Sequence, residues 1–269
     1  MFDSHCHLDA PAFDEDRRAV LMRARTAGVR ALMIPGVHPA GWDRIAAMAT
    51  SELEARAGIE LRFALGVHPQ ALLELSEEAL RGALERLPAL ARAQGASAIG
   101  EIGLDRRLFA SPAGDAARQL ALLDAQLEIA DGLGLPVILH LVRAPGLLLE
   151  RLEQRGPLRH GGVLHAFAGP AALIPRFARL GLSFSFAGSV ARPASRRVRE
   201  AAQAVPEERL LVETDAPDLS PPGAPIRNEP ASLVRVVEAL ASLRGVPAAA
   251  LAAGAEANAR ALFSRRSSA

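Results

Sequence analysis

Two histidines lie two residues apart in the run His5-Cys6-His7, close to the start of the chain. Side chains along an extended strand alternate between its faces, so His5 and His7 point to the same side and can reach one divalent metal ion. An isolated pair of this kind is also common as solvated or packed histidines. The rest of the sequence must therefore decide between a metal-dependent enzyme and a structural pair.

Cys6 is the only cysteine, so the chain cannot form an internal disulfide, which fits a reducing compartment. The alternation that brings the two histidines together turns Cys6 away from them, and we expect it to pack in the core. Met1 leads directly into an apolar run without the basic segment of a signal peptide, and no apolar stretch reaches the roughly 18 residues that span a bilayer. We therefore expect a cytoplasmic protein with no membrane segment, and no motif predicts an obligate protein partner.

The elements that would position these histidines can be read from the alternation of apolar patterns. Eight short apolar runs typical of strands recur along the chain: Met1–Cys6, Ala31–Ile34, Arg62–Gly66, Ala98–Ile102, Val137–Leu141, Gly162–His165, Ser183–Phe186 and Leu210–Val212. Stretches with helical spacing of apolar residues separate them, including Arg17–Ala27, Ile45–Ala57, Glu77–Ala93, Ala116–Leu133 and Leu147–Arg155. Eight strand and helix units within 269 residues are what one closed parallel barrel requires.

The predicted fold is therefore a TIM-type (β/α)8 barrel, with its site at the carboxyl ends of the strands. An open doubly wound sheet is the competing architecture, but no glycine-rich phosphate turn follows the first run. No linker or shift in composition divides the chain, so we expect residues 1–269 to form a single domain. The loop Pro221–Pro225 should lie over the barrel mouth, and the tail Arg265–Ala269 should fray.

Polar residues end most of the predicted strands, where a barrel builds its site. They are His5 and His7 after the first run, His68 after the third, Glu101 in the fourth, His140 in the fifth, His165 in the sixth and Asp215 after the eighth. Each has a structural explanation when taken alone, such as a hydrogen-bonded core histidine or a helix cap. Their occurrence together at one rim favours a metal centre.

Six ligands of mixed imidazole and carboxylate type are too many for one tetrahedral site and suit two divalent ions. We expect His5, His7 and Asp215 to hold one ion, His140 and His165 to hold the other, and Glu101 to bridge them. The chain contains no lysine, so a carboxylated lysine cannot be the bridge. These ligand types leave Zn²⁺, Mn²⁺, Co²⁺ and Mg²⁺ open.

Such ions lower the pKa of a shared water molecule, which then attacks the substrate, and they polarise the bond under attack. Asp215 would orient this water and accept its proton, so Asp215 and Glu101 are the candidate catalytic residues.

Six motifs in this order resemble those of the TatD-related deoxyribonucleases, in the metal-dependent hydrolase (amidohydrolase-like) superfamily. They are Phe2-Asp3-Ser4-His5-Cys6-His7-Leu8, Gly66-Val67-His68-Pro69, Gly100-Glu101-Ile102-Gly103-Leu104-Asp105, Leu135-Pro136-Val137-Ile138-Leu139-His140, His165-Ala166-Phe167-Ala168-Gly169 and Glu213-Thr214-Asp215-Ala216-Pro217. The resemblance covers nearly the whole chain and implies a TIM barrel, two divalent metals and hydrolysis of phosphodiester bonds in DNA. It also implies that His68 contacts substrate phosphate and that Glu213 is a carboxylate behind the metal ligands.

The chain departs from the family pattern at several positions near the site. Family members usually carry arginine two residues after the fifth-strand histidine, where this chain has Val142 followed by Arg143. Arg106-Arg107 replaces an aromatic pair, and Asp218 stands where a tyrosine is common, so base stacking by those aromatics would be lost. Arg143 and Arg192 are candidate substrate contacts, and Arg227-Asn228-Glu229 is a candidate anchor for the loop over the site.

The net charge of +1 excludes a globally basic surface, so contact with nucleic acid would need a local patch. The interpretation favoured by these observations is a divalent-metal hydrolase of phosphodiesters, a DNA exonuclease with DNA or a small phosphodiester as its substrate. One alternative keeps the metals and changes the bond to a small phosphoester, lactone or amide. The other is a non-catalytic metal-binding or scaffold protein.

Overall fold

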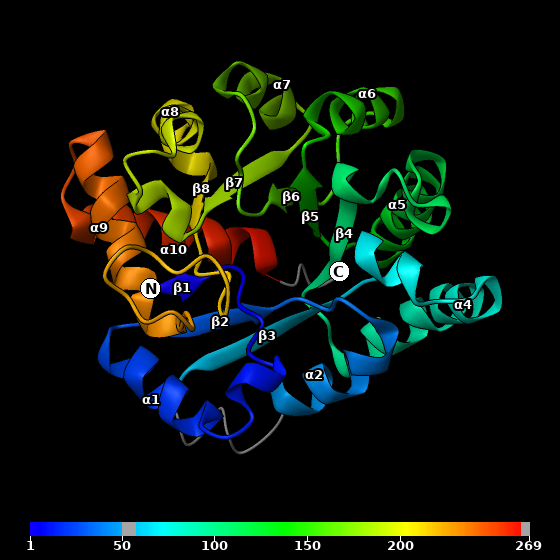
Figure 1. Ribbon diagram of the computed structural model, residues 1–269, viewed down its shortest axis with the longest axis horizontal. Helices are drawn as coiled ribbons and strands as arrows, with labels where there is room; N and C mark the ends of the chain where they lie inside the picture. The colour runs from blue at the N-terminus through cyan, green and yellow to red at the C-terminus, as the bar shows by residue number, and fades with distance from the viewer. Residues whose placement is uncertain (50–57, 265–269) are drawn as a thin grey trace.

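Eight parallel strands form a ring at the centre of the molecule (Figure 1) in the computed structural model, which describes residues 1–49 and 58–264. The strands are β1 (Phe2–Asp3), β2 (Ala31–Ile34), β3 (Glu60–Leu65), β4 (Ala98–Asp105), β5 (Val137–Val142), β6 (Gly162–Leu164), β7 (Leu182–Phe186) and β8 (Leu210–Val212). Each strand pairs in parallel with the next along the chain. This order confirms the predicted barrel.

The first and last strands meet through backbone hydrogen bonds that continue beyond their ends. The Ser4 amide donates to the Val212 carbonyl at 3.0 Å, and the Asp215 amide donates to the His5 carbonyl at 2.9 Å. The His7 amide then donates to the Ala216 carbonyl at 2.8 Å. The segment after β1 and the segment after β8 are therefore fixed side by side.

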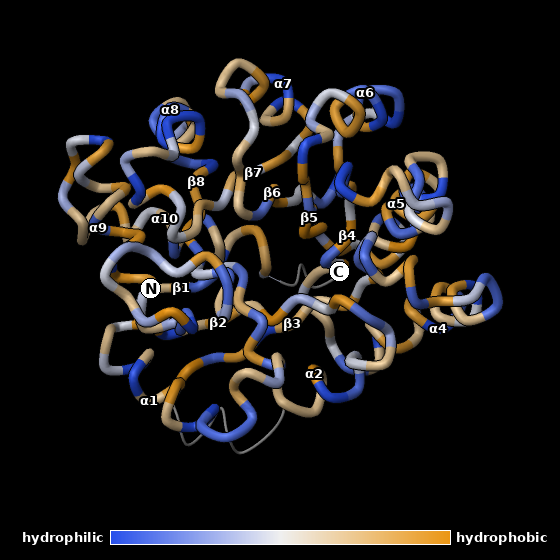
Figure 2. Tube along the Cα trace, viewed as in Figure 1, coloured by the Kyte–Doolittle hydropathy of each residue, from blue (hydrophilic) through white to orange (hydrophobic). Residues whose placement is uncertain are grey.

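Helices surround the ring. They are α1 (Arg17–Thr26), α2 (Trp42–Ala49), α4 (Glu77–Gln94), α5 (Ala116–Leu133), α6 (Pro145–Arg155), α7 (Ile174–Arg179), α8 (Arg196–Ala204), α9 (Leu233–Arg244) and α10 (Ala248–Phe263). Figure 2 shows hydrophilic residues on the outer sides of peripheral helices such as α4 and α6, as expected when the inner side of each helix packs on the strands.

Most predicted element bounds agree with the structure to within two residues, but β1, β4 and the start of α2, at Trp42, differ from the prediction. β1 ends at Asp3, and the chain continues through Cys6 by isolated backbone bonds, including one from the Cys6 amide to the Met33 carbonyl at 2.9 Å. β4 continues three residues past the predicted end, to Asp105. Residues 50–57 of the predicted helix Ile45–Ala57, and the predicted tail Arg265–Ala269, lie outside the described residues.

The barrel interior is closed at the amino ends of the strands by a small apolar cluster. It contains one or two side chains from most strands together with residues of α10: Phe2, Ala31, Met33, Ala64, Ala98, Ile138, Val163, Leu211, Ala259 and Phe263. The rings of Phe2 and Phe263 stack with centroids 5.9 Å apart. Helix α10 therefore plugs this end, and the next inward-facing positions toward the carboxyl ends remain for polar groups.

Side-chain alternation explains which residues occupy those positions. Ile138 and Val163 face the interior, so residues two further along, His140 and His165, face it as well. Strand β4 departs from simple alternation because its register with β5 shifts between Ile99 and Ile102. This bulge turns Glu101 from the outward face, where Ile99 packs, to the interior.

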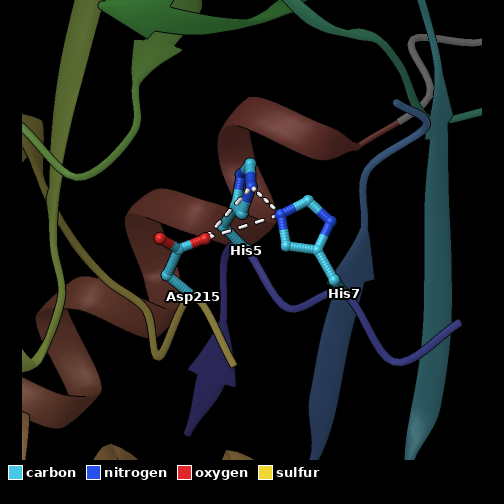
Figure 3. A group of neighbouring side chains, drawn as sticks. All are labelled: His5, His7 and Asp215. Carbon is cyan, nitrogen blue, oxygen red and sulfur yellow. Dashed lines mark hydrogen bonds and ion pairs between the residues drawn. The ribbon is translucent and has the colours of Figure 1, made fainter. Parts of the chain in front are cut away.

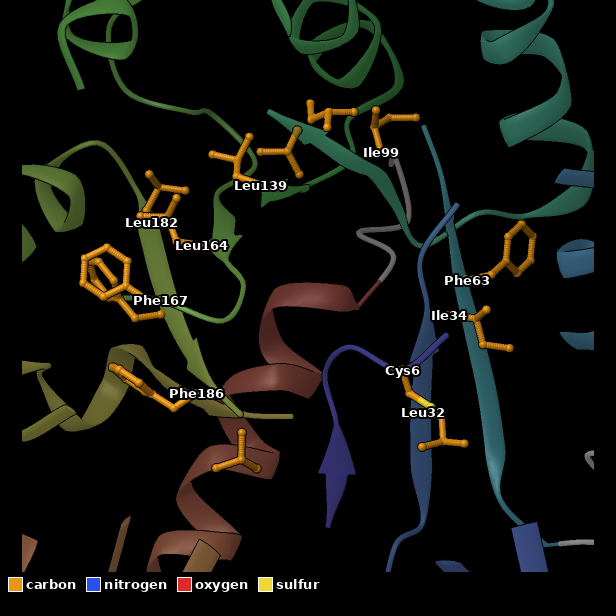
Figure 4. Close-up of a cluster of buried hydrophobic side chains, with 14 of the residues drawn as sticks. Cys6, Leu32, Ile34, Phe63, Ile99, Leu139, Leu164, Phe167, Leu182 and Phe186 are labelled. Carbon is orange, nitrogen blue, oxygen red and sulfur yellow. The ribbon is translucent and has the colours of Figure 1, made fainter. Parts of the chain in front are cut away.

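A second, larger apolar cluster fills the space between the barrel and the helices. Figure 4 shows part of it, including Cys6, Leu32, Ile34, Phe63 and Ile99. Cys6 is fully buried there, and burial raises the pKa of its thiol well above the usual value. The prediction that Cys6 packs in the core is confirmed.

No single helix among residues 1–49 and 58–264 is long and apolar enough to cross a membrane. The segments Pro230–Arg244 and Ala248–Phe263 reach the required length and composition only when taken together, and they are bent by 110°.

Gly100 lies within the bulge of β4 and packs so closely that any side chain there should destabilise the protein. A Cβ at this position would lie 2.6 Å from the Ile138 Cβ and 3.1 Å from the Ile138 carbonyl oxygen. We expect Gly100→Ala to lower the free energy of unfolding by about 1–3 kcal/mol, the usual cost of overpacking. Urea denaturation measures this change.

Gly82→Ala is the matched control, because Gly82 lies on the exposed face of α4, where a Cβ would meet no side chain and no other element within 4 Å. It should raise the free energy of unfolding by about 0.5–1 kcal/mol. A Gly100→Ala protein as stable as the wild type would contradict the packing described for β4.

Candidate metal centre

Glu101 lies at the centre of a cluster of histidines at the carboxyl ends of the strands. Its Oε1 atom is 2.7 Å from His140 Nδ1, 2.8 Å from His165 Nε2 and 3.4 Å from His68 Nε2. Its Oε2 atom faces the other way, 3.2 Å from His5 Nε2 and 3.8 Å from His7 Nε2. Each carboxylate oxygen therefore faces a different set of imidazoles.

Asp215 completes the group around Oε2 of Glu101. Its Oδ1 atom lies 3.6 Å from His5 Nε2 and 3.5 Å from His7 Nε2, and the two imidazole nitrogens are 3.3 Å apart (Figure 3). On the other side, His140 Nδ1 and His165 Nε2 are 3.2 Å apart. The structure brings together all six residues predicted as metal ligands.

Burial and the surrounding charges set the protonation of this cluster. Burial opposes ionisation of Glu101, but the surrounding imidazoles, His165 foremost, hold the pKa of this carboxyl well below its usual range. Burial alone would lower the pKa of His7, and the carboxylates of Asp215 and Glu101 instead raise it to about 9. An ionised carboxylate is thus available at the point where the imidazole nitrogens converge.

The nitrogens and oxygens of this cluster fit divalent ions. Three groups have ligand atoms within 4.8 Å of one another: His5, His7 and Asp215; His5, Glu101 and His165; and His68, Glu101 and His140. Imidazole nitrogens about 3.3 Å apart present lone pairs to a shared point, and a cation there would take the place of protons. The donor set of neutral nitrogens with anionic oxygens is the type that Zn²⁺, Mn²⁺ and Co²⁺ accept.

His68 differs from the other histidines of the cluster in how its ring is held. Its Nδ1 atom accepts a hydrogen bond from the Gln70 amide at 3.0 Å, which caps the short helix Pro69–Leu73. A neutral imidazole that accepts at Nδ1 carries its proton on Nε2. His68 therefore points a donor toward Glu101 and the interior, a role unlike that of a metal ligand.

Asp3 joins the two segments that carry His5 and Asp215. Its carboxyl accepts hydrogen bonds from the Thr214 amide at 2.9 Å and the Thr214 hydroxyl at 2.6 Å, and from the His5 amide at 3.4 Å. Complete burial raises the pKa of Asp3 to about 8, against the opposing effect of the Thr214 hydrogen bonds. Asp3 and Thr214 were not singled out from the sequence, although both lie within the quoted motifs.

Asn228 fixes the turn that contains Asp215, whose φ of 55° is unusual for a residue other than glycine. The buried Asn228 amide donates to the Thr214 carbonyl at 2.9 Å and to the Asp218 carbonyl at 2.7 Å. Two backbone groups on either side of Asp215 are therefore held by one side chain.

Charged residues next to Asn228 tie this loop to α1 and to the residue before it. Arg227 donates to both carboxylate oxygens of Asp16 at 2.7 and 2.8 Å, and Arg23 donates to Glu229 at 2.7 and 2.8 Å. The loop after β8 is thus fastened to the segment that follows His7. These contacts confirm the predicted anchoring role of Arg227-Asn228-Glu229.

Glu213 lies behind His165, as the resemblance implied. Its Oε1 atom accepts a hydrogen bond from the Ala166 amide at 2.6 Å and lies 3.7 Å from His165 Nδ1. Ala166 has a φ of 42°, so this bond holds the chain in an unfavourable conformation directly after His165. Glu213 is completely buried and acts on the backbone that carries His165.

Asp105 is a further residue near the cluster that the sequence analysis did not single out. Its Oδ2 atom lies 3.4 Å from His140 Nε2, on the side of the ring opposite Glu101. Extension of β4 to Asp105 brings this side chain to the interior, two alternating steps beyond Glu101. A correct end for β4, together with period-2 counting from Glu101, would have found it.

Two buried glutamines of α5 hold the strand ends near the cluster. The Gln119 side chain accepts from the Asp105 amide at 2.7 Å and donates to the Asp105 carbonyl at 3.0 Å. Gln126 makes the same pair of bonds to Val67, at 2.7 and 3.0 Å, next to His68. The two glutamines are seven residues apart, so they lie on one face of the helix.

The predicted arginine contacts lie outside the cluster. Arg143 is exposed, has a φ of 55°, and makes no side-chain hydrogen bond or ion pair within the described ranges. Its predecessor Val142 pairs with Asp105, so Arg143 follows β5 directly beside the loop after β4. Arg192 is also exposed and donates to the Ser220 carbonyl at 2.8 Å, which links two loops.

Comparisons with known proteins agree with this fold. A family model described as TatD related DNase matches residues 2–264. An uncharacterized metal-dependent hydrolase, YjjV of Escherichia coli (strain K12), is 38% identical over 91% of each chain. A 3′-5′ ssDNA/RNA exonuclease TatD of Erwinia billingiae is 35% identical over 98% of each chain.

The crystal structure of YjjV, a TatD homologue from Escherichia coli K12, superposes with a TM-score of 0.87. In that superposition the identity is 34%, with 98% of this chain and 97% of the other covered. The chain therefore belongs to the TatD related DNase family and is a metal-dependent hydrolase of that family.

Proposed function

We propose that this protein hydrolyses phosphodiester bonds of single-stranded nucleic acid, as an exonuclease that uses two divalent ions on either side of Glu101. The observation that carries the proposal is the division of the Glu101 carboxylate between two sets of imidazoles, because each of its oxygens then faces the ligands of a different ion. The relative named as a 3′-5′ ssDNA/RNA exonuclease supports the choice of substrate.

In this proposal one ion is held by His5, His7 and Asp215, and the other by His140 and His165. Glu101 would contribute a carboxylate oxygen to each of them. Bound ions of this kind lower the pKa of water and stabilise the charge that develops on a phosphate under attack. Mg²⁺, Mn²⁺ and Zn²⁺ each accept some of these ligand types.

The chain's own residues then orient the reactants. Asp215 turns Oδ1 toward His5 and His7, which leaves Oδ2 to orient the attacking water and accept its proton. His68 directs its Nε2 proton into the site, where it can donate to a phosphate oxygen. Arg143 and Arg192, which are exposed, contribute positive charge that attracts the backbone of the nucleic acid.

A small phosphodiester is the second candidate substrate, and the placement of the aromatic residues favours it. Eight of the nine phenylalanines are buried, as is Trp42, whose indole donates to the Gly66 carbonyl at 3.0 Å. Phe109 is half-buried. Few aromatic faces are therefore available for stacking on nucleobases, the contact that single-strand binding proteins generally use.

We place this activity in the cytoplasm. The single cysteine is buried, so the protein has no need of an oxidising compartment for its stability.

Replacing Glu101 tests the bridging role. Glu101→Gln keeps the shape of the side chain but removes the charge shared by the two ions. We expect the metal content, measured by elemental analysis, to fall from about two ions to less than one ion per chain. Turnover of bis(p-nitrophenyl) phosphate should fall on the order of 10³-fold, the scale of losing one electrostatic stabiliser.

Glu200→Gln is the control for this substitution, since Glu200 is exposed on α8. It should change neither metal content nor turnover. A Glu101→Gln protein that kept both ions and most of its activity would refute the bridge.

Arg143→Ala tests whether the barrel mouth binds a nucleic acid. The variant should raise the KM for a single-stranded oligonucleotide and reduce the slope of log KM against log salt by about 1, as expected for one lost phosphate contact. Arg159→Ala is the matched control, because Arg159 is an exposed arginine that precedes β6 at the opposite end of the barrel. Cleavage of bis(p-nitrophenyl) phosphate without cleavage of the oligonucleotide would decide for the small phosphodiester.

A further inference from the structure

The His140 ring lies between two carboxylates that approach opposite nitrogens. Nδ1 is 2.7 Å from Glu101 Oε1, and Nε2 is 3.4 Å from Asp105 Oδ2. Burial alone would lower the pKa of His140, and these two carboxylates raise it instead. An imidazole with an acceptor behind one nitrogen is held in one ring orientation and one tautomer, which leaves its other nitrogen free for a cation.

Asp105 is itself held more firmly than an isolated carboxylate would be. Arg107 donates from Nε to both carboxylate oxygens at 3.0 Å, and the Arg107 amide donates to Oδ1 at 2.9 Å. A further bond joins Arg107 Nη2 to Oδ2 at 2.5 Å. Gln119 fixes the backbone of the same residue through the Asp105 amide and carbonyl.

The Asp105 side chain is 2% exposed, whereas that of Arg107 is 58% exposed. A buried carboxylate facing only a histidine would be costly, and the guanidinium offsets this cost from the solvent side. Arg107 therefore allows Asp105 to remain ionised directly behind His140. The pair Arg106-Arg107, which replaces the aromatic pair of the family pattern, thus supplies the guanidinium that holds Asp105.

We propose that Asp105 is a positioning residue that fixes His140 for the ion on its side of Glu101, and that Arg107 fixes Asp105. This inference rests on the proposed function, because it assumes that His140 is a metal ligand. Carboxylates behind a ligating histidine typically contribute a factor of about 10–100 to metal affinity or activity. The effect should be confined to one of the two ions, since the other is held by His5, His7 and Asp215.

Equilibrium dialysis against Mn²⁺ tests the proposal in the full-length protein and its variants. Wild type should bind two ions. Asp105→Asn should lower the affinity for one of them by about 10–100-fold and leave the affinity for the other unchanged. Arg107→Gln should lower the affinity for the same ion to a smaller extent. Turnover of bis(p-nitrophenyl) phosphate by both variants should return toward the wild-type value as the Mn²⁺ concentration is raised. A general loss of folding would not produce this recovery.

Asp124→Asn is the matched control. Arg151 holds Asp124 in the same forked arrangement, with Nε at 2.8 and 3.0 Å from the two carboxylate oxygens, but this pair joins α5 to α6. The control should bind both ions as the wild type does.

The outcomes separate this inference from the proposed function. If wild type binds two ions and Asp105→Asn binds them equally well, the positioning role is wrong and the proposed function stands. If wild type binds no Mn²⁺, both are overturned. Should Asp105→Asn fail to fold, Arg107→Gln decides alone, and unchanged Mn²⁺ affinity in that variant would overturn the inference.

Discussion

The ionised carboxylate of Glu101 is buried at the centre of the barrel mouth, with a side chain only 3% exposed. A charge removed from water to this extent must be paired, because desolvation costs far more than a protein of this size could otherwise tolerate. The partners are imidazoles from β5 and from the segments that follow β1, β3 and β6, which together surround both carboxylate oxygens. The surrounding strands bring these groups to one point.

A parallel barrel suits this task because it delivers the carboxyl ends of all its strands to one rim. The apolar plug supplied by α10 fills the opposite end, so the polar positions begin one alternating step above it. Bonds between side chains and backbone then fix the strand ends individually. Asp3 and Asn228 fix the segments around His5 and Asp215, and the α5 glutamines fix those before His68 and after Glu101.

The sequence was sufficient to predict the barrel and the convergence of the six predicted ligands, because parallel strands bring the residues at their carboxyl ends to one rim. Period-2 alternation accounts for His140 and His165 on its inner face, but not for Glu101. It was insufficient for the bulge in β4, where Gly100 packs closely against Ile138, because a bulge leaves no periodic signal. Asp105 was missed for the same reason, since the strand was expected to end at Ile102. The supporting roles of Gln119, Gln126 and Asn228 could not be predicted, because each depends on a contact between elements distant in sequence.

The central claim is that Glu101 lies between two ions. A crystal structure of the protein with Mn²⁺, with anomalous difference maps, tests it most directly. Two anomalous peaks roughly 3.5–4 Å apart, each within bonding distance of a different Glu101 oxygen, are the predicted result. A single peak that touches one Glu101 oxygen alone, or peaks that leave Glu101 unbound, would contradict the account.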